Sequence, residues 1–441
     1  MSTTNSSATT HGGPDRDSDA ERDGARRGVA PRRFFGQLEG MRALAAIGVL
    51  TTHVAFQTRA VELPVLGPVL GRLDLAVALF FGLSGFLLWR PWVAAAHGAA
   101  PTPSVRRYLA HRFVRIWPAY VVVVVLVLTL LPDAKNADLT VWIANLTLTQ
   151  VFVPLSLTAG LTQMWSLSVE VAFYALLPII GWALLRLRVD RRADQRTCAD
   201  DSGRIAWRIP ALMGLGVLSL GWAWVAMVLP VAAGVEPKNW VFGHLPWFVA
   251  GLVLAELVGA IELDEHRPVA RWVRIVVRVG AHRVWMGIVL VIAYTLACTP
   301  LAGPTGLGAL APWQFAVKMV LGAICGFALL APLVLSAGPF RVLTSRVMVA
   351  LGRWSYGIFI WHLAVLAVVF PLFGILPFNG DFLLVWAITL GLTIGVSAAS
   401  YAFIEEPARR WLRTRERTRP ERSRSTVISQ TVSETATSAG S

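Results

Sequence analysis

Long apolar runs, most of them 18 or more residues in length, recur along the 441-residue chain. A helix needs about 20 residues to cross a hydrocarbon core of about 30 Å. The runs are continuous and do not alternate with polar residues, which excludes the strands of a membrane barrel. The sequence therefore predicts an all-α, polytopic membrane protein of about ten transmembrane helices. The expected spans lie near 42–57, 73–95, 113–131, 165–185, 209–230, 242–260, 284–299, 313–335, 354–373 and 382–404.

Composition supports a protein whose partner is the lipid bilayer. Hydrophobic residues make up 55% of the chain and charged residues 15%, with a mean hydropathy of +0.60, values that a soluble domain does not reach. The net charge of +14 does not indicate nucleic-acid binding, because the basic residues cluster between apolar runs and form no single interleaved patch. The three cysteines have no paired spacing, so we expect neither a disulfide scaffold nor a metal site.

Basic residues predict the orientation of the chain, since Lys and Arg accumulate in short cytoplasmic loops. Ten spans place both termini in the cytoplasm. The cytoplasmic segments then hold Arg32 and Arg33, Arg106, Arg107, Arg112 and Arg115, and the Arg-rich stretches 186–208, 267–283, 341–353 and 409–424. The external loops hold Arg59, Arg72, Lys135 and Lys238. An eleventh span at 139–157 inverts this pattern, so we expect that polar-interrupted stretch to be interfacial or re-entrant.

The chain divides into one membrane domain and two polar ends. Residues 1–33 contain no apolar stretch of signal-peptide length, so we expect a disordered cytoplasmic segment and no cleavable signal peptide. Residues 34–411 form the transmembrane domain. Residues 412–441 are first Arg-rich and then Ser/Thr-rich, which is typical of a disordered cytoplasmic tail.

Arg42 and His53 are the two ionisable residues inside the first span, where such groups indicate function. They are eleven residues apart, which places both on one helix face, about 16 Å apart along the axis. This suits a substrate such as acyl-CoA, whose phosphates stay at the surface while its thioester reaches inward. A neutral imidazole can accept a proton from an attacking hydroxyl, so His53 is a candidate general base. Alternatively, His53 makes an interhelical hydrogen bond and Arg42 anchors the helix.

Six ordered segments resemble the motifs of the acyltransferase 3 family of membrane O-acyltransferases. The matching segments are EGMR (39–42) with His53, LFFGLSGF (79–86), RFVRIWP (112–118), WSLSVE (165–170) with Phe173-Tyr174, GRWSYG (352–357) with Trp361-His362, and EEP (405–407). Ala78 and Val171 stand where the family often carries carboxylates. The hydrolase-like domain appended to many members has no counterpart, so we expect no second catalytic step on this chain.

The resemblance implies that His53 is the catalytic histidine and that Arg42, Arg112 and Arg115 hold the phosphates of acyl-CoA. Forked guanidinium donors suit phosphate, which agrees with this assignment. For Arg112 and Arg115 the alternative is ordinary anchoring at the cytoplasmic interface. Acyl-CoA is then a co-substrate, and no permanently bound cofactor is expected. Family members acylate surface polysaccharides, peptidoglycan sugars, glycolipids and some macrolides.

Other motif residues are candidates for catalysis or substrate binding. Glu170 shares a helix face with Ser166, and it could orient His53, hold an acceptor hydroxyl, or pair with a neighbouring helix. We expect Ser166, Tyr356 and His362 to contact substrate. His362 lies at a depth comparable to His53 and could line the same cavity or only pack. Ser84 lacks a nucleophile elbow, so we interpret it as a small-residue helix contact.

The sequence thus predicts a multi-pass O-acyltransferase that moves an acyl group, acetyl by default, from cytoplasmic acyl-CoA to a hydroxyl of a carbohydrate, glycolipid or macrolide. The alternative is a transporter or flippase of a lipid-linked glycan, although no internal repeat or matched broken helices are found. The Arg-heavy, Lys-poor composition indicates the plasma membrane of a high-GC bacterium.

Overall fold

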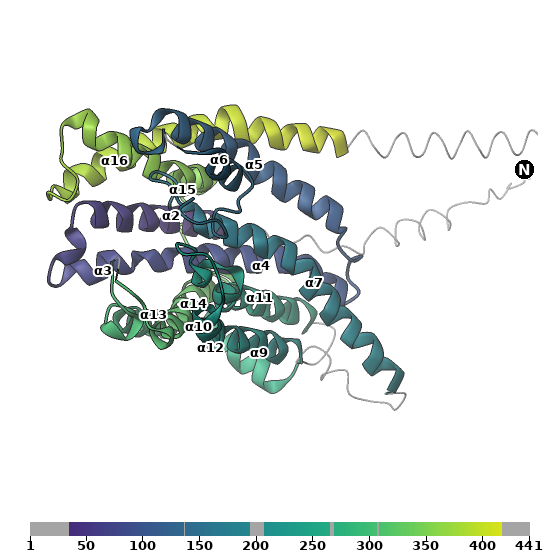
Figure 1. Ribbon diagram of the computed structural model, residues 1–441. Helices are drawn as coiled ribbons and strands as arrows, with labels where there is room; N and C mark the ends of the chain where they lie inside the picture. The colour runs from purple at the N-terminus through teal and green to yellow at the C-terminus, as the bar shows by residue number, and fades with distance from the viewer. Residues whose placement is uncertain (1–34, 136, 195–206, 265–268, 307, 417–441) are drawn as a thin grey trace, which may run out of the picture.

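The computed structural model describes residues 35–135, 137–194, 207–264, 269–306 and 308–416, and it contains no strand within these ranges. The helices form one bundle (Figure 1). They are α2 (Gly36–Gln57), α3 (Leu66–Arg72), α4 (Ala76–Ala96), α5 (Val105–Leu130), α6 (Leu139–Leu146), α7 (Met164–Asp194), α9 (Arg208–Leu220), α10 (Trp222–Val228), α11 (Val241–Asp264), α12 (Arg271–Ala281), α13 (Arg283–Ala297), α14 (Pro312–Leu335), α15 (Arg346–Phe373) and α16 (Phe382–Ser400), with the short turns η1 (Ala60–Glu62), η2 (Leu73–Leu75), η3 (Pro132–Ala134), η4 (Pro237–Asn239) and η5 (Pro300–Ala302) and the π-helix η6 (Tyr401–Glu405).

Each of the expected spans falls on one helix or on consecutive helices. Within the described ranges, eight helices are long and apolar enough to cross a membrane, and α12 with α13, bent by 78° at their junction, could make a ninth. α2 has 22 residues, which is enough for a crossing. It is not one of the eight helices, and it carries the polar residues Glu39, Arg42 and His53. The prediction of an all-α polytopic membrane protein is confirmed.

The two ends of the described chain lie at the same end of the bundle (Figure 1). α16 continues through η6 to Glu416, so the prediction of disorder is wrong for residues 412–416. Residues 1–34 and 417–441, and the Arg-rich stretch 195–206 with Cys198, lie outside the described residues. We refer to residues 406–416 as the C-terminal extension.

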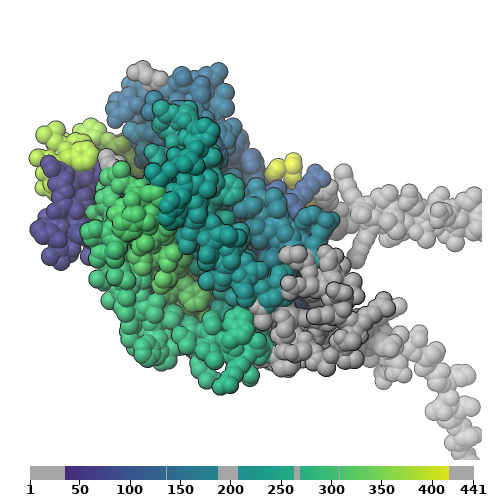
Figure 2. Space-filling view, turned by 60° about the horizontal axis from the view of Figure 1, so that its bottom comes forward, coloured from purple at the N-terminus to yellow at the C-terminus, as the bar shows by residue number. Residues whose placement is uncertain are grey.

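Burial separates inner helices from outer ones. In the most apolar stretch of the span formed by η4 and α11, 89% of the residues are buried, whereas the corresponding share is 22% for α9 with α10 and for α16 with the C-terminal extension. The middle of the chain, drawn in teal and green, covers the face seen in Figure 2, with the purple and yellow-green segments at one edge. The exposed apolar helix surfaces fit contact with lipid tails.

The stretch 139–157 does not span, as predicted. It contains α6, an eight-residue helix that rises only about 12 Å, followed by turns. Asn145 Nδ2 donates to the backbone carbonyl oxygens of Val141 and Ser156, each at 2.9 Å. The backbone carbonyl oxygen of Asn145 accepts from the Tyr120 hydroxyl at 2.6 Å. These bonds satisfy backbone groups of the folded-back segment, as burial requires.

Two buried arginines tie distant helices together. Arg72, which the sequence places in an external loop, is fully buried and donates to the carbonyl oxygens of Ala297, Ala302 and Gly303. Arg208 pairs with the fully buried Glu256 at 3.1 Å. These groups have partners because an unpaired buried charge is costly.

Candidate active site

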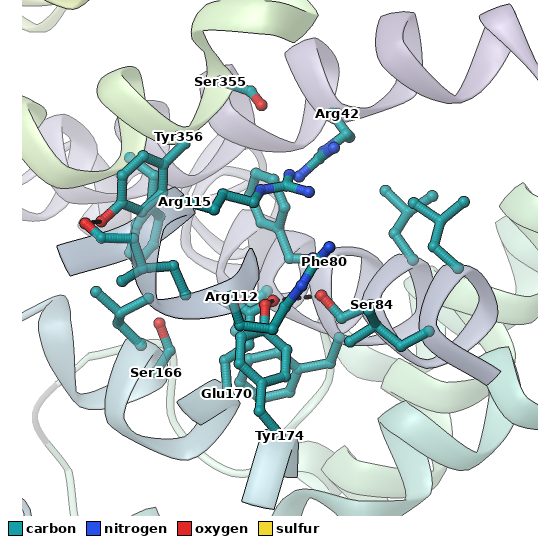
Figure 3. Close-up of a pocket in the computed structure, with 18 residues that line it drawn as sticks. Arg42, Phe80, Ser84, Arg112, Arg115, Ser166, Glu170, Tyr174, Ser355 and Tyr356 are labelled. Atoms are coloured by element: carbon teal, nitrogen blue, oxygen red, sulfur yellow. Dashed lines mark hydrogen bonds between the residues drawn. The ribbon is translucent and has the colours of Figure 1, made fainter. Parts of the chain in front are cut away.

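A narrow cavity of about 50 Å³ lies where α2, α4, α5, α7 and α15 meet. Arg42, Arg112 and Arg115 line it together, as the sequence predicted, although they come from two helices. Their guanidinium groups turn toward one another and toward Glu170 (Figure 3). The cavity is far smaller than the roughly 300–1,000 Å³ of ligand pockets. A ligand can therefore pass only if its walls move.

Glu170 belongs to this arginine-lined cavity. Its Oε1 accepts hydrogen bonds from the Ser84 hydroxyl and from the Tyr174 hydroxyl, the latter at 2.7 Å. Ser84 is therefore more than a small-residue helix contact, because it joins α4 to the carboxylate of α7. No described hydrogen bond links Glu170 to His53. Glu170 thus fixes the hydroxyls of Ser84 and Tyr174 at the wall of the arginine-lined cavity.

The arginines of the cavity carry more positive charge than the nearby carboxylates offset. Arg42 Nη1 lies 3.8 Å from Glu39 Oε1, at the limit of an ion pair. Among the described residues, no carboxylate lies within ion-pair distance of Arg112 or Arg115. Clustered guanidinium groups repel one another unless an anion joins them, so the cavity is suited to a phosphate or another multivalent anion.

His53 contacts His362. The rings lie 5.0 Å apart between centroids, and His362 Nε2 is 3.3 Å from His53 Nδ1. His362 is completely buried and is not part of the cavity wall. It therefore lies behind His53, which fits the packing role rather than the cavity-lining role that the sequence left open. Contact of His362 with substrate stays a prediction.

The hydrogen-bond partners determine which nitrogen of each ring carries the proton. The carbonyl oxygens of Ile358 and Phe359 lie 3.1 and 2.7 Å from His362 Nδ1, so this nitrogen must donate. In the neutral ring, Nε2 is then an acceptor. His53 Nδ1 lies 2.8 Å from the Val49 carbonyl oxygen and also faces His362 Nε2, so it must donate too. This leaves His53 Nε2 unprotonated, with no hydrogen-bond partner among the described residues.

His53 lines a second and much larger cavity of about 1290 Å³. The wall is largely apolar but also includes Trp165, His244 and an ion pair between Lys318 Nζ and Asp74 Oδ2 at 2.6 Å. Stretches between the long helices complete it, at 131–133, 159–162, 236–239, 305–306, 308–310 and 375–377. Apolar surface with a few polar groups is typical of a small-molecule site.

The two cavities are adjacent, with Val77 lining both. Arg42 and His53 share one face of α2 and lie about 16 Å apart along its axis. The arginines therefore lie in one of two adjoining cavities, and the unprotonated Nε2 of His53 belongs to the other.

Ser166 and Tyr356, the other predicted substrate contacts, line the narrow cavity. Their hydroxyls donate to backbone carbonyl oxygens, Ser166 to Gln163 at 3.1 Å and Tyr356 to Ile116 at 2.8 Å. Both residues thus also help to fix the helices, and their contact with substrate stays a prediction.

Sequence reasoning did not find three features of the site. Tyr174 could have been found, since it is four residues after Glu170 and so on the same helix face. The pairing of His53 with His362, and that of Asp74 with Lys318, joins residues more than 200 positions apart. No local pattern indicates either contact.

Comparison with known proteins gives a consistent result. A family model described as "Acyltransferase domain" matches residues 35–402. The chain is 26% identical over 359 residues to the acyltransferase MdmB of Streptomyces mycarofaciens, an alignment that covers 75% of this chain and 78% of that protein. It is 25% identical over 404 residues to a putative O-acetyltransferase of Staphylococcus aureus strain COL, with 86% and 58% coverage.

A further relative is the peptidoglycan O-acetyltransferase OatA of Listeria monocytogenes, 23% identical over 397 residues, with 86% of this chain and 56% of OatA covered. The chain thus spans little more than half the length of the staphylococcal and listerial relatives. No solved structure matches it significantly.

Proposed function

The chain belongs to the acyltransferase 3 family of membrane O-acyltransferases, and on that premise we propose that it moves an acyl group from cytoplasmic acyl-CoA to a hydroxyl of a sugar-containing acceptor. Acetyl is the default acyl group. His53 is the general base, and Arg42, Arg112 and Arg115 bind the donor. The acceptor is a cell-envelope glycan, a glycolipid or a macrolide, and the enzyme acts in the plasma membrane.

One observation carries this proposal: His53, whose hydrogen-bond partners assign the ring proton to Nδ1, lines a cavity of about 1290 Å³ that adjoins an arginine-lined cavity. A base needs a free lone pair within reach of the hydroxyl that it deprotonates. A large cavity has room for a bulky acceptor, and the arginines offer a site for donor phosphates.

In the reaction, His53 Nε2 takes the acceptor's hydroxyl proton as that oxygen attacks the thioester carbonyl carbon. The tetrahedral intermediate collapses, the C–S bond breaks and the ester remains on the acceptor. The CoA thiolate leaves and recovers the proton from the imidazolium. His362 and the Val49 carbonyl hold the imidazole in the required tautomer, which is the role of an orienting partner in other general-base sites.

The reading as a transporter or flippase is less favoured, because the family match covers nearly all of the membrane region. The name of OatA makes peptidoglycan a reasonable first acceptor to test. The Asp74–Lys318 pair and Trp165 offer charged, hydrogen-bonding and stacking groups of the kind that sugar hydroxyls and sugar rings use.

Replacing His53 with Ala should abolish acyl transfer while the protein still inserts in the membrane. The measurement is CoA thiol release from acetyl-CoA by purified enzyme with cell-envelope glycans, together with mass spectrometry of the glycans. A general base contributes about 10²–10⁴-fold to the rate, so the loss should reach that range. His282→Asn, at the exposed N-cap of α13, is a matched control. A His53→Ala enzyme with wild-type turnover removes His53 from the mechanism.

A further inference from the structure

A basic groove lies beside the narrow cavity, at the surface between α5 and the C-terminal extension. It has a volume of about 230 Å³ and is lined by His111, Arg112, Val114, Arg115, Arg409, Leu412 and Arg413. Arg409 and Arg413 have side chains 28% and 58% exposed, so water-borne ligands can reach them. No carboxylate belongs to this lining. The groove therefore presents four guanidinium groups from two helices to one space.

The arginines of the groove are weakly paired. Arg112 and Arg115 have no carboxylate within ion-pair distance among the described residues. Arg409 meets Glu405 at 3.3 Å and Arg413 meets Glu406 at 3.5 Å, both within their own helical segment. The Arg413–Glu406 pair is the more exposed of the two, and pairs of that kind contribute little and exchange readily for a stronger anion. A phosphate between the two helices could accept forked hydrogen bonds from both sides.

The groove connects with the proposed path of the donor. Arg112 and Arg115 line both the groove and the narrow cavity, and the narrow cavity adjoins the cavity of His53 at Val77. A ligand with several phosphates at one end and a narrow chain at the other matches this arrangement, because the arginines line the groove and the narrow cavity beyond it is small. The volume of the groove is several times the roughly 30 Å³ that a water takes in the liquid, which leaves room for a diphosphate.

We propose that this groove binds the phosphates of the CoA nucleotide, and that Arg409 and Arg413 of the C-terminal extension are donor-binding residues. The inference rests on the proposed function and adds to it a second helical segment, the C-terminal extension, that binds the donor. The EEP motif and η6 then serve to bring the extension back toward α5, where η6 packs. Short π-helical segments within α-helices, such as η6, are frequent at functional sites.

Glu416 of the C-terminal extension contacts two residues of α5 at one end of the groove. Glu416 Oε1 accepts from Arg107 Nε at 2.9 Å and lies 2.9 Å from His111 Nε2. The contact joins the start of α5 to the end of the extension.

The test measures the Kd of CoA for the full-length protein in nanodiscs of phosphatidylcholine, by titration calorimetry. The double variant Arg409→Ala/Arg413→Ala should weaken CoA binding about tenfold or more, since each charge-assisted hydrogen bond to an anion contributes measurably. Arg410→Ala is the matched control: Arg410 lies on the same extension, 74% exposed and outside the groove lining, and its loss should leave the Kd unchanged.

The double variant Arg409→Lys/Arg413→Lys serves if the alanine variant does not fold. It keeps the charge but loses the fork, so its Kd should lie between those of the wild type and of the alanine variant. A double alanine variant that folds and binds CoA with the wild-type Kd overturns the inference while leaving the proposed function intact. A wild-type protein that does not bind CoA overturns the donor assignment of the proposed function, and the inference with it.

Lipid headgroups also carry phosphate, so the measurement is repeated in nanodiscs that contain phosphatidylglycerol. If the groove is a nucleotide site, the double alanine substitution should weaken CoA binding by the same factor in both lipids, apart from the electrostatic effect of the charged lipid surface on all variants. If the substitution alters CoA binding only when phosphatidylglycerol is present, the groove belongs to lipid and the inference is wrong.

Discussion

At the scale of single residues, the chemistry of this site depends on the tautomer of His53. Its Nδ1 is committed to the Val49 carbonyl oxygen and to His362, which leaves Nε2 free. His362 is in turn held by two carbonyl oxygens of α15. In the mechanism that we propose, a buried residue outside the cavity wall thus decides whether the base is competent, as orienting partners do in other general-base sites.

Replacing His362 should therefore affect turnover more than donor binding. His362→Asn retains a donor near the position of Nδ1 but does not reach His53, so kcat should fall by about tenfold, below the roughly 10²–10⁴-fold that the base itself contributes. The KM for acetyl-CoA should stay unchanged. Steady-state kinetics on purified protein measure both quantities.

His362→Gln is the matched comparison, because its amide oxygen can lie near the position of Nε2 and accept from His53. It should recover part of the lost kcat. If Asn and Gln variants lose activity equally, or if the loss appears only in KM, the orienting role of His362 is wrong.

At the scale of elements, buried polar ties fix how short segments join the bundle. Arg72, at the end of α3, satisfies carbonyl oxygens at the end of α13 and in and after η5. These segments border the wall of the His53 cavity at 305–306 and 308–310. The tie therefore connects stability with the shape of the proposed acceptor site.

Arg72→Ala should lower the melting temperature of the protein in detergent. The change leaves three buried carbonyl oxygens without their donor, and each unmet acceptor costs about 1–3 kcal/mol. Arg59→Ala is the control, because Arg59 is 58% exposed and pairs only with Glu62; exposed pairs contribute about 0–1 kcal/mol. Equal melting temperatures for the two variants contradict the structural role of Arg72.

At the scale of the whole molecule, the two ends of the bundle differ in kind. One end carries the basic groove and both ends of the described chain, and the other carries the loops around the large cavity (Figure 1). The positive-inside pattern assigns the basic end to the cytoplasm. In the mechanism that we propose, a donor from the cytosol and an acceptor from the opposite side meet at His53 without either crossing the membrane fully.

Cysteine labelling tests this orientation. In a background without Cys198, Cys298 and Cys325, Ala309→Cys in the large-cavity loops should react with a membrane-impermeant maleimide on intact cells, since Ala309 is exposed. Arg410→Cys should react only after permeabilisation. The reverse result places the basic groove outside and removes cytosolic acyl-CoA as donor.

Several features follow from sequence alone. Apolar runs of this length form helices because lipid offers no partner for backbone N–H and C=O groups. Polar residues within 139–157, and the charge pattern that an eleventh span would invert, identified that stretch as a non-spanning segment. The resemblance to the acyltransferase 3 family grouped Arg42 with Arg112 and Arg115 as donor-binding residues, and the three line one cavity.

Only the tertiary structure decided which helix faces meet. It paired His53 with His362 and placed Glu170 in the wall of the arginine-lined cavity. It also buried Arg72 and brought Arg409 and Arg413 against α5. Helical periodicity fixes the face on which a side chain lies but not the neighbour that this face contacts. That choice depends on the rotation and tilt of each helix, which are set by packing between segments far apart in the chain.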